Sequence, residues 1–298
     1  MASINLPRTM EIGAGASTKL QEIFERLGVG RPFLVVDRYI IDSGLADRIL
    51  APLDAAGTPY RLFSDIVPDP TVAAVMAGLA AISEGEHDCV VGIGGGSALD
   101  TAKALAVFSV HGGHPSTYKA PHVQDAPGLP VIAIPTTAGT GSEATRIMII
   151  TDEQTDEKML CAGLAYLPVA ALIDYELTLS KPERLTIDTA IDSLTHAIEA
   201  YVSRRASPFS DGMAILAMRN IATNLRTVVA DPGNRAAREA LMLGATQGGI
   251  AFSNASVALV HGMSRPIGAF FHVPHGLSNA MLLPVVTEFS SGAALARY

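Results

Sequence analysis

The sequence predicts two parts of different fold class: an α/β part with a parallel sheet over residues 1–180, and an all-α part over residues 181–298. In the first part, short apolar runs of strand type alternate with helical stretches, a pattern typical of parallel strands joined by helices. From Pro182 onward, apolar residues recur only at helical spacing. The sequence contains no internal repeat and no low-complexity tract.

The first expected helix illustrates the start, stripe and stop signals from which the other helices are predicted. Ser17 has the residue type of an N-cap, an apolar stripe runs from Leu20 to Leu27, and Gly28 is a typical stop. Segment 111–128 is rich in Gly, Pro and His and predicts a loop. The other expected elements are strands at 33–37, near 60, at 89–93, 130–135 and 169–174, and helices at 43–56, from 71, and at 97–108, 211–230, 235–252 and 257–270.

Composition narrows the class of protein and its partners. The chain has 298 residues, is 49% hydrophobic and 17% charged, and so has the profile of a globular enzyme. A net charge of −8 with no basic run argues against a nucleic-acid or anionic-membrane partner. Two cysteines without CxxC spacing predict neither a disulfide framework nor a zinc knuckle. Because we find no signal peptide and no apolar run of membrane-spanning length, we expect a soluble cytoplasmic protein.

A glycine-rich loop follows the expected strand at 89–93. Gly94, Gly95 and Gly96 precede Ser97, which we expect to cap the next helix. Glycines let a backbone approach a ligand closely, and free N–H groups at a helix N-terminus favour a phosphate. The pattern is neither GxGxxG nor a Walker A loop. A phosphate site and a simple tight turn therefore remain equal alternatives.

Two further strand ends carry polar groups. The segment after the strand at 130–135 reads TTAGTGSE and offers two glycines and the hydroxyls of Thr136, Thr137, Thr140 and Ser142. Ligands of open α/β sheets bind outside the carboxyl ends of strands, so these loops are candidates for one crevice. Asp37 also ends a strand, where a carboxylate can accept bonds from both hydroxyls of an adenosine ribose and would repel a 2′-phosphate. The alternative for Asp37 is a capping role in the next turn.

A pair of metal-type residues lies on one expected helix. Asp192 and His196 are four apart, so a helix places them on the same face. Neither residue type is easily buried without a partner. With His261 and His275 they would form a set of three imidazoles and one carboxylate, which suits Fe²⁺ or Zn²⁺. For each histidine taken alone, a satisfied core or turn residue is the alternative, and we expect His275 to lie in an exposed turn.

Five motifs in the chain resemble those of one known family. In order they are GGGSALDTAK, PTTAGTGSE, DSLTHAIEAY, ALVHGMSRPIG and VPHGLSNAMLLP, spread over nearly the whole sequence. On these motifs the chain resembles the iron-containing (group III) alcohol dehydrogenases. The resemblance implies a dehydroquinate synthase-like architecture, with a dinucleotide-binding N-terminal domain, a helical metal-binding C-terminal domain and a metal in the cleft between them.

The resemblance also implies residue roles. The metal ligands would be Asp192, His196, His261 and His275. The NAD-binding residues would be Asp37, Gly94, Gly95, Gly96, Ser97, Asp100, Thr136, Thr137, Ser142 and Lys158. Asp37 matches the strand-end acid associated with preference for NAD over NADP. Lys158 would reach the ribose on the nicotinamide side, with a solvated lysine after an acidic turn as the alternative.

The chain departs from the family pattern in two places. Arg265 stands where members often carry a histidine near the substrate, and arginine stays protonated, so it cannot act as a general base. It can still steer an anionic or hydroxylated substrate. Members also usually continue through further helices, whereas this sequence stops at Tyr298, so we expect the helical part to be incomplete.

The predicted activity is metal-dependent hydride transfer between NAD(H) and a short primary alcohol or diol and its aldehyde. Fe²⁺ is the expected ion, with Zn²⁺ as an alternative, and the protein is expected to be a homo-oligomer, a dimer or larger. The expected catalytic residues are His261, His275, Arg265 and His272, the last as one route for the proton. The alternatives are a glycerol dehydrogenase-like or maleylacetate reductase-like enzyme, and an inactive, truncated module that binds a dinucleotide or forms oligomers.

Overall fold

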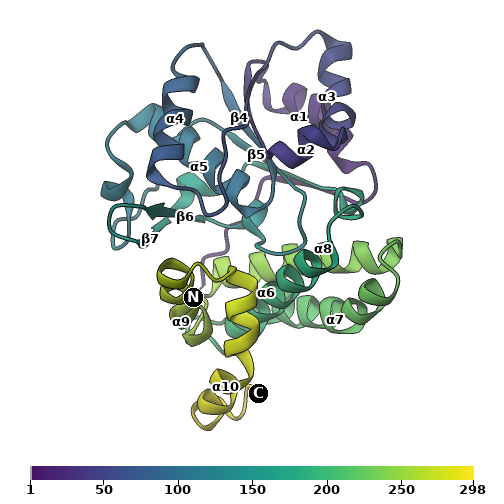
Figure 1. Ribbon diagram of the computed structural model, residues 1–298, viewed down its shortest axis with the longest axis vertical. Helices are drawn as coiled ribbons and strands as arrows, with labels where there is room; N and C mark the ends of the chain where they lie inside the picture. Colours follow the sequence, from purple (N-terminus) through teal and green to yellow (C-terminus); the bar gives the residue numbers. More distant parts are fainter. Residues whose placement is uncertain (1) are drawn as a thin grey trace. The chain divides into compact units, whose positions relative to one another are not determined.

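The computed structural model describes residues 2–298, which divide into two compact units (Figure 1). The α/β unit comprises Pro7–Thr136 and Ser142–Leu177. The helical unit comprises the chain up to Leu6, the short segment Thr137–Gly141, and Thr178–Tyr298. The division is therefore not a single cut in the sequence, because one loop after a strand belongs to the helical unit.

The α/β unit contains a six-stranded sheet in which every neighbouring pair is parallel. The strand order is β1-β8-β5-β4-β2-β3. The strands are β1 (Thr9–Ile12), β2 (Pro32–Val36), β3 (Arg61–Phe63), β4 (Cys89–Gly94), β5 (Val131–Pro135) and β8 (Ala170–Ile173). The predicted parallel sheet is confirmed, and β1 is a strand that the sequence patterns did not indicate.

Alternation along the strands assigns the helices to opposite faces of the sheet (Figure 1). Phe33 and Val35 of β2 pack into a core with α4 (Val72–Ile82) and α5 (Gly96–His111). Leu34 and Val36 pack into a second core with α1 (Leu20–Leu27) and α3 (Leu45–Ala56). Successive strand side chains point to opposite faces, so fully buried strands of this kind read as unbroken apolar runs.

The order of the strands reverses between β2 and β4. After β2 the chain passes through α2 (Arg38–Asp42) and α3 on one face, whereas after β4 it enters α5 on the other face. Such a reversal opens a crevice outside the carboxyl ends of the two strands. Asp37 follows β2 and Gly94 ends β4, so both lie at this point.

An antiparallel hairpin packs beside α5. It consists of β6 (Ile147–Asp152) and β7 (Glu157–Ala162), and its residues Met148, Ile150, Met159 and Cys161 join the core that contains α4 and α5. The remaining elements of the α/β part are the short 3-10 helices Ala16–Lys19, Pro115–Tyr118, Ser142–Ala144, Leu164–Tyr166 and Tyr175–Thr178.

Three local predictions were wrong for identifiable reasons. Ser17 lies inside a 3-10 turn and donates its hydroxyl to Asp174 Oδ2 at 2.7 Å, so a long-range partner replaces the cap. Ser97 lies within the first turn of α5, because the N-cap is Gly95, two residues earlier than expected. His275 is the first residue of a long helix and not part of an exposed turn. Pro274 immediately before it starts that helix, since a proline fits the end of a helix where no N–H is required.

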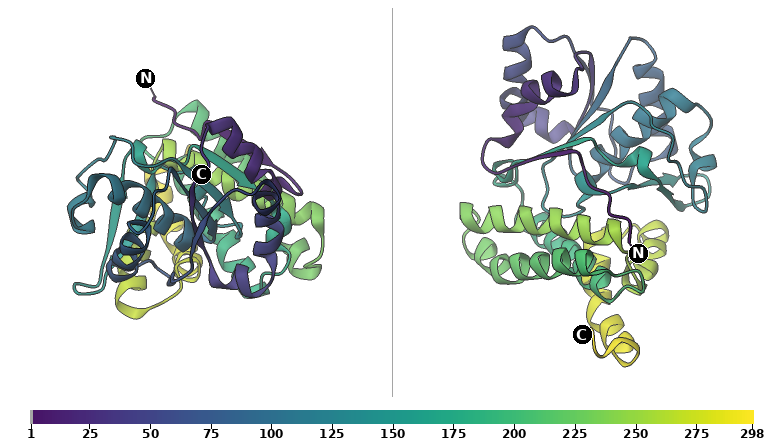
Figure 2. Two further views of the ribbon diagram at one scale, coloured as in Figure 1. Left: turned by 90° about the horizontal axis from the view of Figure 1, so that it is seen from above. Right: turned by 180° about the vertical axis from the view of Figure 1, so that it is seen from behind.

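The other unit is helical, as predicted. It contains α6 (Glu183–Val202), α7 (Pro208–Ala230), α8 (Arg235–Asn254), α9 (Leu259–Phe271) and α10 (His275–Ala294). Helices α6, α7 and α8 pack against one another, and α10 packs on α6 and α9 (Figure 2). None of the helices formed by residues 2–298 has the length and apolar character of a membrane span.

Candidate functional site

One face of α6 carries three buried polar side chains. Asp192 and His196 are one turn apart, and Glu199 continues the same stripe one turn further on. All three are nearly inaccessible to solvent. A helix with such a face needs polar partners from neighbouring elements, because unpaired buried polar groups are destabilising.

Glu199 binds the beginning of α9 and orients His261. Its Oε1 accepts the backbone N–H of Val260 at 2.6 Å, and its Oε2 lies 2.5 Å from His261 Nδ1. The first N–H groups of a helix have no partner within the helix, and a carboxylate there is also favoured by the helix dipole. When His261 Nδ1–H donates to this carboxylate, the lone pair of His261 Nε2 is left to point at the remaining groups.

The start of α10 brings His275 to the same place. Gly276 lies so close to α6 that a Cβ atom on it would be 2.2 Å from the backbone oxygen of Asp188. Only glycine permits this approach, and it sets the first turn of α10 against the turn of α6 that precedes Asp192.

Asp192, His261 and His275 form a cluster of metal-ligand type. One ligand atom from each lies within 4.8 Å of the others. Asp192 Oδ1 is 3.4 Å from His261 Nε2 and 3.6 Å from His275 Nε2. Two imidazoles and a carboxylate, with Glu199 behind one imidazole, fit a divalent transition metal, whose ligating histidines usually donate their other N–H to a carboxylate.

His196, the fourth predicted ligand, lies beside this three-residue cluster. Its ring stacks on His261 and on Phe252, each with centroids 4.3 Å apart. Its Nδ1 is buried and has no hydrogen-bond partner among residues 2–298. Burial lowers the pKa of His196 to about 3, more than Asp192 raises it, so the imidazole is neutral. A neutral imidazole with an unpartnered nitrogen is compatible with a place in a metal site.

Charges within the cluster favour an ionised Asp192. Burial acts to raise the pKa of Asp192, but the neighbouring His196, His275 and His261 outweigh it and lower the pKa. For His261 burial acts to lower the pKa, but hydrogen bonds to Asp192 and Glu199 raise it. A proton and a cation therefore compete for the same lone pair on His261.

The two other predicted catalytic residues lie on α9 or at its C-terminal cap. Arg265 is one helical turn after His261 and half-buried, and burial lowers the pKa of its guanidinium. No carboxylate among residues 2–298 lies within ion-pair distance of it. His272 is exposed and ends α9 in a left-handed conformation. The structure does not bring His272 into the metal-type cluster.

In the α/β unit, Asp37 and the glycine loop are neighbours. A Cβ atom on Gly94 would lie 2.9 Å from Cβ of Asp37 and 2.6 Å from Cβ of Ala98, at a φ of +157° that favours glycine. The Asp37 carboxylate accepts the N–H of Tyr39, so it does cap α2. Thr136 donates its backbone N–H to Gly94, and its Oγ1 is buried without a partner among residues 2–298. These groups could hold a phosphate-bearing ligand next to the loop.

Lys158 and Ser97 both contact a residue that the sequence patterns did not single out. Asp69 Oδ2 forms an ion pair with Lys158 Nζ at 2.9 Å, and the backbone N–H of Asp69 donates to Ser97 Oγ. Asp69 has a positive φ of 53°, uncommon for a residue other than glycine. The Lys158 side chain is only 8% exposed, so it is not the solvated lysine of the alternative prediction.

Asp100 and Ser142 form hydrogen bonds within the α/β unit. Ser142 donates to Asp100 Oδ1 at 2.7 Å and accepts from Lys103 Nζ at 2.8 Å. Asp100 Oδ2 also accepts the backbone N–H of Ile149. Lys103 is fully buried and donates further to Thr145 and Ile147 oxygens. This network ties α5 to the segment that leads into the hairpin.

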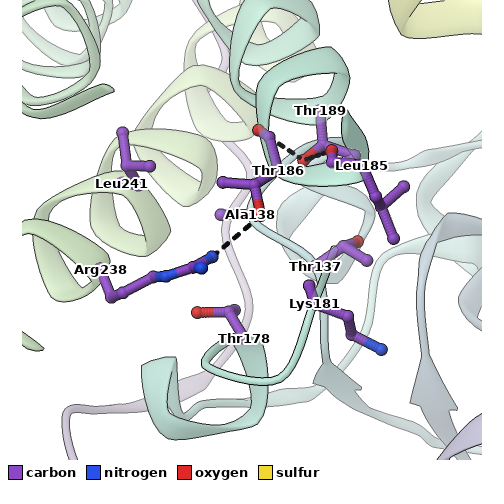
Figure 3. A pocket seen from close by; sticks show the side chains of 9 residues that line it. All are labelled: Thr137, Ala138, Thr178, Lys181, Leu185, Thr186, Thr189, Arg238 and Leu241. Carbon is purple, nitrogen blue, oxygen red and sulfur yellow. Dashed lines mark hydrogen bonds between the residues drawn. The ribbon is translucent and has the colours of Figure 1, made fainter. Parts of the chain in front are cut away.

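Thr137 lines a small pocket of the helical unit (Figure 3). Arg238 points into it and donates to Thr186 Oγ1 at 3.0 Å. The pocket residues are Thr137, Ala138, Thr178, Lys181, Leu185, Thr186, Thr189, Arg238 and Leu241. None of them belongs to the metal-type cluster.

Sequence reasoning missed Glu199 and Asn279. Glu199 follows Asp192 by seven residues and so continues the helical stripe, a signal that was present in the sequence. Asn279 follows His275 by four and contacts Asp192, His261 and His275. Its residue type gives no metal signal, and only the packing of α10 on α6 reveals it.

Comparison with known proteins identifies the family. The family model described as iron-containing alcohol dehydrogenase matches residues 7–175, and that of the Fe-containing alcohol dehydrogenase family, C-terminal, matches residues 186–298. This chain belongs to the iron-containing alcohol dehydrogenase family. The family predicted from the five motifs is confirmed, and the predicted enzyme class, a metal-dependent oxidoreductase, is confirmed with it.

Several relatives align over nearly all of this iron-containing alcohol dehydrogenase. Long-chain-alcohol dehydrogenase 1 of Geobacillus thermodenitrificans (strain NG80-2) is 41% identical over 292 residues, 97% of this chain and 73% of that protein. NAD-dependent methanol dehydrogenase of Bacillus methanolicus is 35% identical over 298 residues, 100% of this chain and 78% of that protein. The crystal structure of a 1,3-propanediol oxidoreductase superposes with a TM-score of 0.94 at 35% identity, covering 98% of this chain and 77% of that one, which confirms the fold.

We expect Glu199→Gln to weaken metal binding without removing a ligand. The amide cannot replace the charged acceptor of His261 Nδ1–H, so the imidazole loses its fixed orientation and the affinity for Zn²⁺ should fall about 10–100-fold. The measurement is a competition titration of the metal-stripped protein with a fluorescent chelator. Glu157→Gln, an exposed change on β7, is the control and should leave the affinity unaltered. Wild-type affinity in Glu199→Gln would contradict the role assigned to Glu199.

Proposed function

We propose that this family member is an NAD-dependent alcohol dehydrogenase that interconverts a short primary alcohol or diol and its aldehyde. The observation that carries the proposal is the buried cluster of Asp192, His261 and His275, with Glu199 fixing one imidazole and His196 adjacent. Names of relatives add support, because they include an NAD-dependent methanol dehydrogenase and a 1,3-propanediol dehydrogenase.

The cluster would hold one divalent ion, which we propose to be Fe²⁺, with Zn²⁺ as the alternative. When bound, the ion supplies Lewis acidity that favours the alkoxide form of the substrate. Three imidazole nitrogens and one carboxylate oxygen suit both metals, so the donor set alone does not choose between them. The intact ligand set disfavours a metal-free reductase.

The side chains of the cluster prepare this chemistry. Asp192 provides the negative charge, and the pKa of His196 leaves its imidazole neutral and able to ligate. Glu199 accepts the hydrogen bond of His261 Nδ1–H, which would leave Nε2 available to a bound ion. We assign the nicotinamide cofactor to the loops that follow β2, β4 and β5, where Asp37, Gly94 and Thr136 meet.

Arg265 supports a second candidate substrate class within the same reaction. Its half-buried guanidinium lies one turn from His261 and pairs with no carboxylate of residues 2–298. Glu199 favours the charged guanidinium from beyond ion-pair distance. A half-buried cation without a directly paired carboxylate favours an anionic ligand. An aldehyde or alcohol that carries a carboxylate would therefore suit this site better than its neutral analogue.

The metal assignment is tested by metal content and rate in His196→Ala and His261→Ala. Each change removes one proposed ligand, so metal per chain and the NAD-dependent rate should both fall, while NAD affinity should persist because its loops lie elsewhere in the chain. Elemental analysis of anaerobically purified protein gives the metal content. Full metal content and activity in either variant would contradict the four-ligand site. Cofactor binding without turnover in the metal-loaded wild type would favour the inactive module.

For cofactor choice, we expect kcat/KM with NAD to exceed that with NADP by about tenfold or more, because the Asp37 carboxylate repels a 2′-phosphate. Asp37→Gly removes this charge and should narrow the difference, while Asp42→Gly, at the end of α2, serves as a control. Steady-state rates with both cofactors decide the matter. Equal kcat/KM for the two cofactors in the wild type would show that Asp37 does not select NAD.

For substrate class, succinic semialdehyde and butanal form a matched pair that differs in one carboxylate. Arg265→Leu should lower kcat/KM for succinic semialdehyde about tenfold or more, because a charge-assisted contact is lost. Activity with butanal should change much less. If both substrates lose activity equally, Arg265 acts on the metal centre as a whole and does not recognise an anion.

A further inference from the structure

The amide of Asn279 occupies the middle of the metal-type cluster. Its Nδ2 lies 2.6 Å from Asp192 Oδ1, 3.1 Å from His261 Nε2 and 3.2 Å from His275 Nε2. These three atoms belong to the three residues that the cluster offers to a cation. Asn279 is completely buried, and it lies one turn after His275 on α10.

The chemistry of the three neighbours fixes which end of the amide points inward. Asp192 presents a carboxylate, and in the tautomer whose Nδ1–H donates to Glu199, His261 presents its Nε2 lone pair. An amide oxygen in the same place would face the carboxylate at 2.6 Å, acceptor against acceptor. The partly positive NH₂ group is the end of the side chain that attracts all three atoms.

The arrangement leaves polar groups unsatisfied. An NH₂ group has two protons, so three acceptors cannot each receive a full hydrogen bond. Asn279 Oδ1 is buried and has no partner among residues 2–298. An unpaired buried carbonyl is destabilising, so the position of the amide depends on its attraction to the cluster.

We propose that Asn279 is a positioning residue that acts as a built-in placeholder for the cation. In the metal-free protein its amide holds Asp192, His261 and His275 together, because its NH₂ group faces all three. Nδ2 and an ion cannot share one position, so the amide must leave the centre when the ion enters. Metal affinity then reflects the difference between binding the ion and displacing the amide.

The inference rests on the proposed function only in that the same cluster receives a metal. It assigns to the site a further residue, Asn279, which does not ligate the ion but competes with it. A residue that merely orients Asp192 in the loaded site would have the opposite effect on affinity, because its loss would weaken metal binding. Stability of the metal-free protein gives a second readout that needs neither metal nor turnover.

The test compares Asn279→Ala with the wild type, using the full chain and Zn²⁺ alone as the probe. In metal-stripped protein the urea unfolding midpoint should fall, because three acceptors lose their common donor. The affinity for Zn²⁺, measured by chelator competition, should rise by about tenfold if the displaced conformer makes up about a tenth of the wild-type population. Saturating Zn²⁺ should remove most of the stability difference between the two proteins.

Asn254→Ala is the matched control, since Asn254 is also a buried asparagine whose amide donates two hydrogen bonds, to Ile250 and Asn5 oxygens. It should lower stability equally with and without Zn²⁺ and leave the affinity unchanged. Asn279→Asp serves if Asn279→Ala does not fold. It keeps the shape but places a carboxylate opposite Asp192, so the stripped protein should lose stability and Zn²⁺ should restore it.

The outcomes separate this inference from the proposed function. Weaker Zn²⁺ binding in Asn279→Ala, or an unchanged unfolding midpoint of the stripped protein, would overturn the placeholder role even in an active, metal-binding enzyme. Failure of the wild type to bind metal would refute the proposed function. The same failure would also refute the displacement of the amide by an ion. A lower urea unfolding midpoint of metal-stripped Asn279→Ala would then assign Asn279 a structural role only.

Discussion

The contact between Glu199 and the start of α9 is the interaction on which the metal-type cluster depends. One carboxylate accepts the N–H of Val260 in the first turn of α9 and the Nδ1–H of His261. It therefore fixes where the helix begins relative to α6 and which nitrogen of His261 remains available. Without it, His261 would have neither a defined tautomer nor a defined position beside Asp192.

The lone pairs of the cluster converge on one space, and several partly or fully positive groups compete for that space. A proton, the Asn279 amide and a divalent ion all favour the space between Asp192, His261 and His275, because each brings positive charge to converging acceptors. Burial strengthens every one of these interactions by lowering the local dielectric constant. The same burial lowers the pKa of His196 and keeps that imidazole neutral.

The α/β unit meets a different constraint, which is close backbone approach. At the point where the strand order reverses, the absence of a side chain on Gly94 lets the end of β4 lie against Asp37. Behind the loop, Lys103 connects α5 to the segment before the hairpin through bonds to Ser142, Thr145 and Ile147. Two residues with predicted cofactor roles, Asp100 and Ser142, belong to this internal network, whereas Asp37 and Thr136 lie next to the glycine loop.

The sequence by itself determined the class of each part and the residues on a single helix. Apolar runs that alternate with helical stretches predicted the parallel sheet, and helical spacing predicted that Asp192 and His196 share one face. Both predictions depend on the local periodicity of the chain. This periodicity could not predict contacts between segments that are distant in the sequence. Ser17 pairs with Asp174, Glu199 with His261, and Asn279 with Asp192, each across more than 60 residues of sequence. Only tertiary packing decided these partners, because a buried polar group takes whichever partner the fold brings near, and local sequence does not record which one that is.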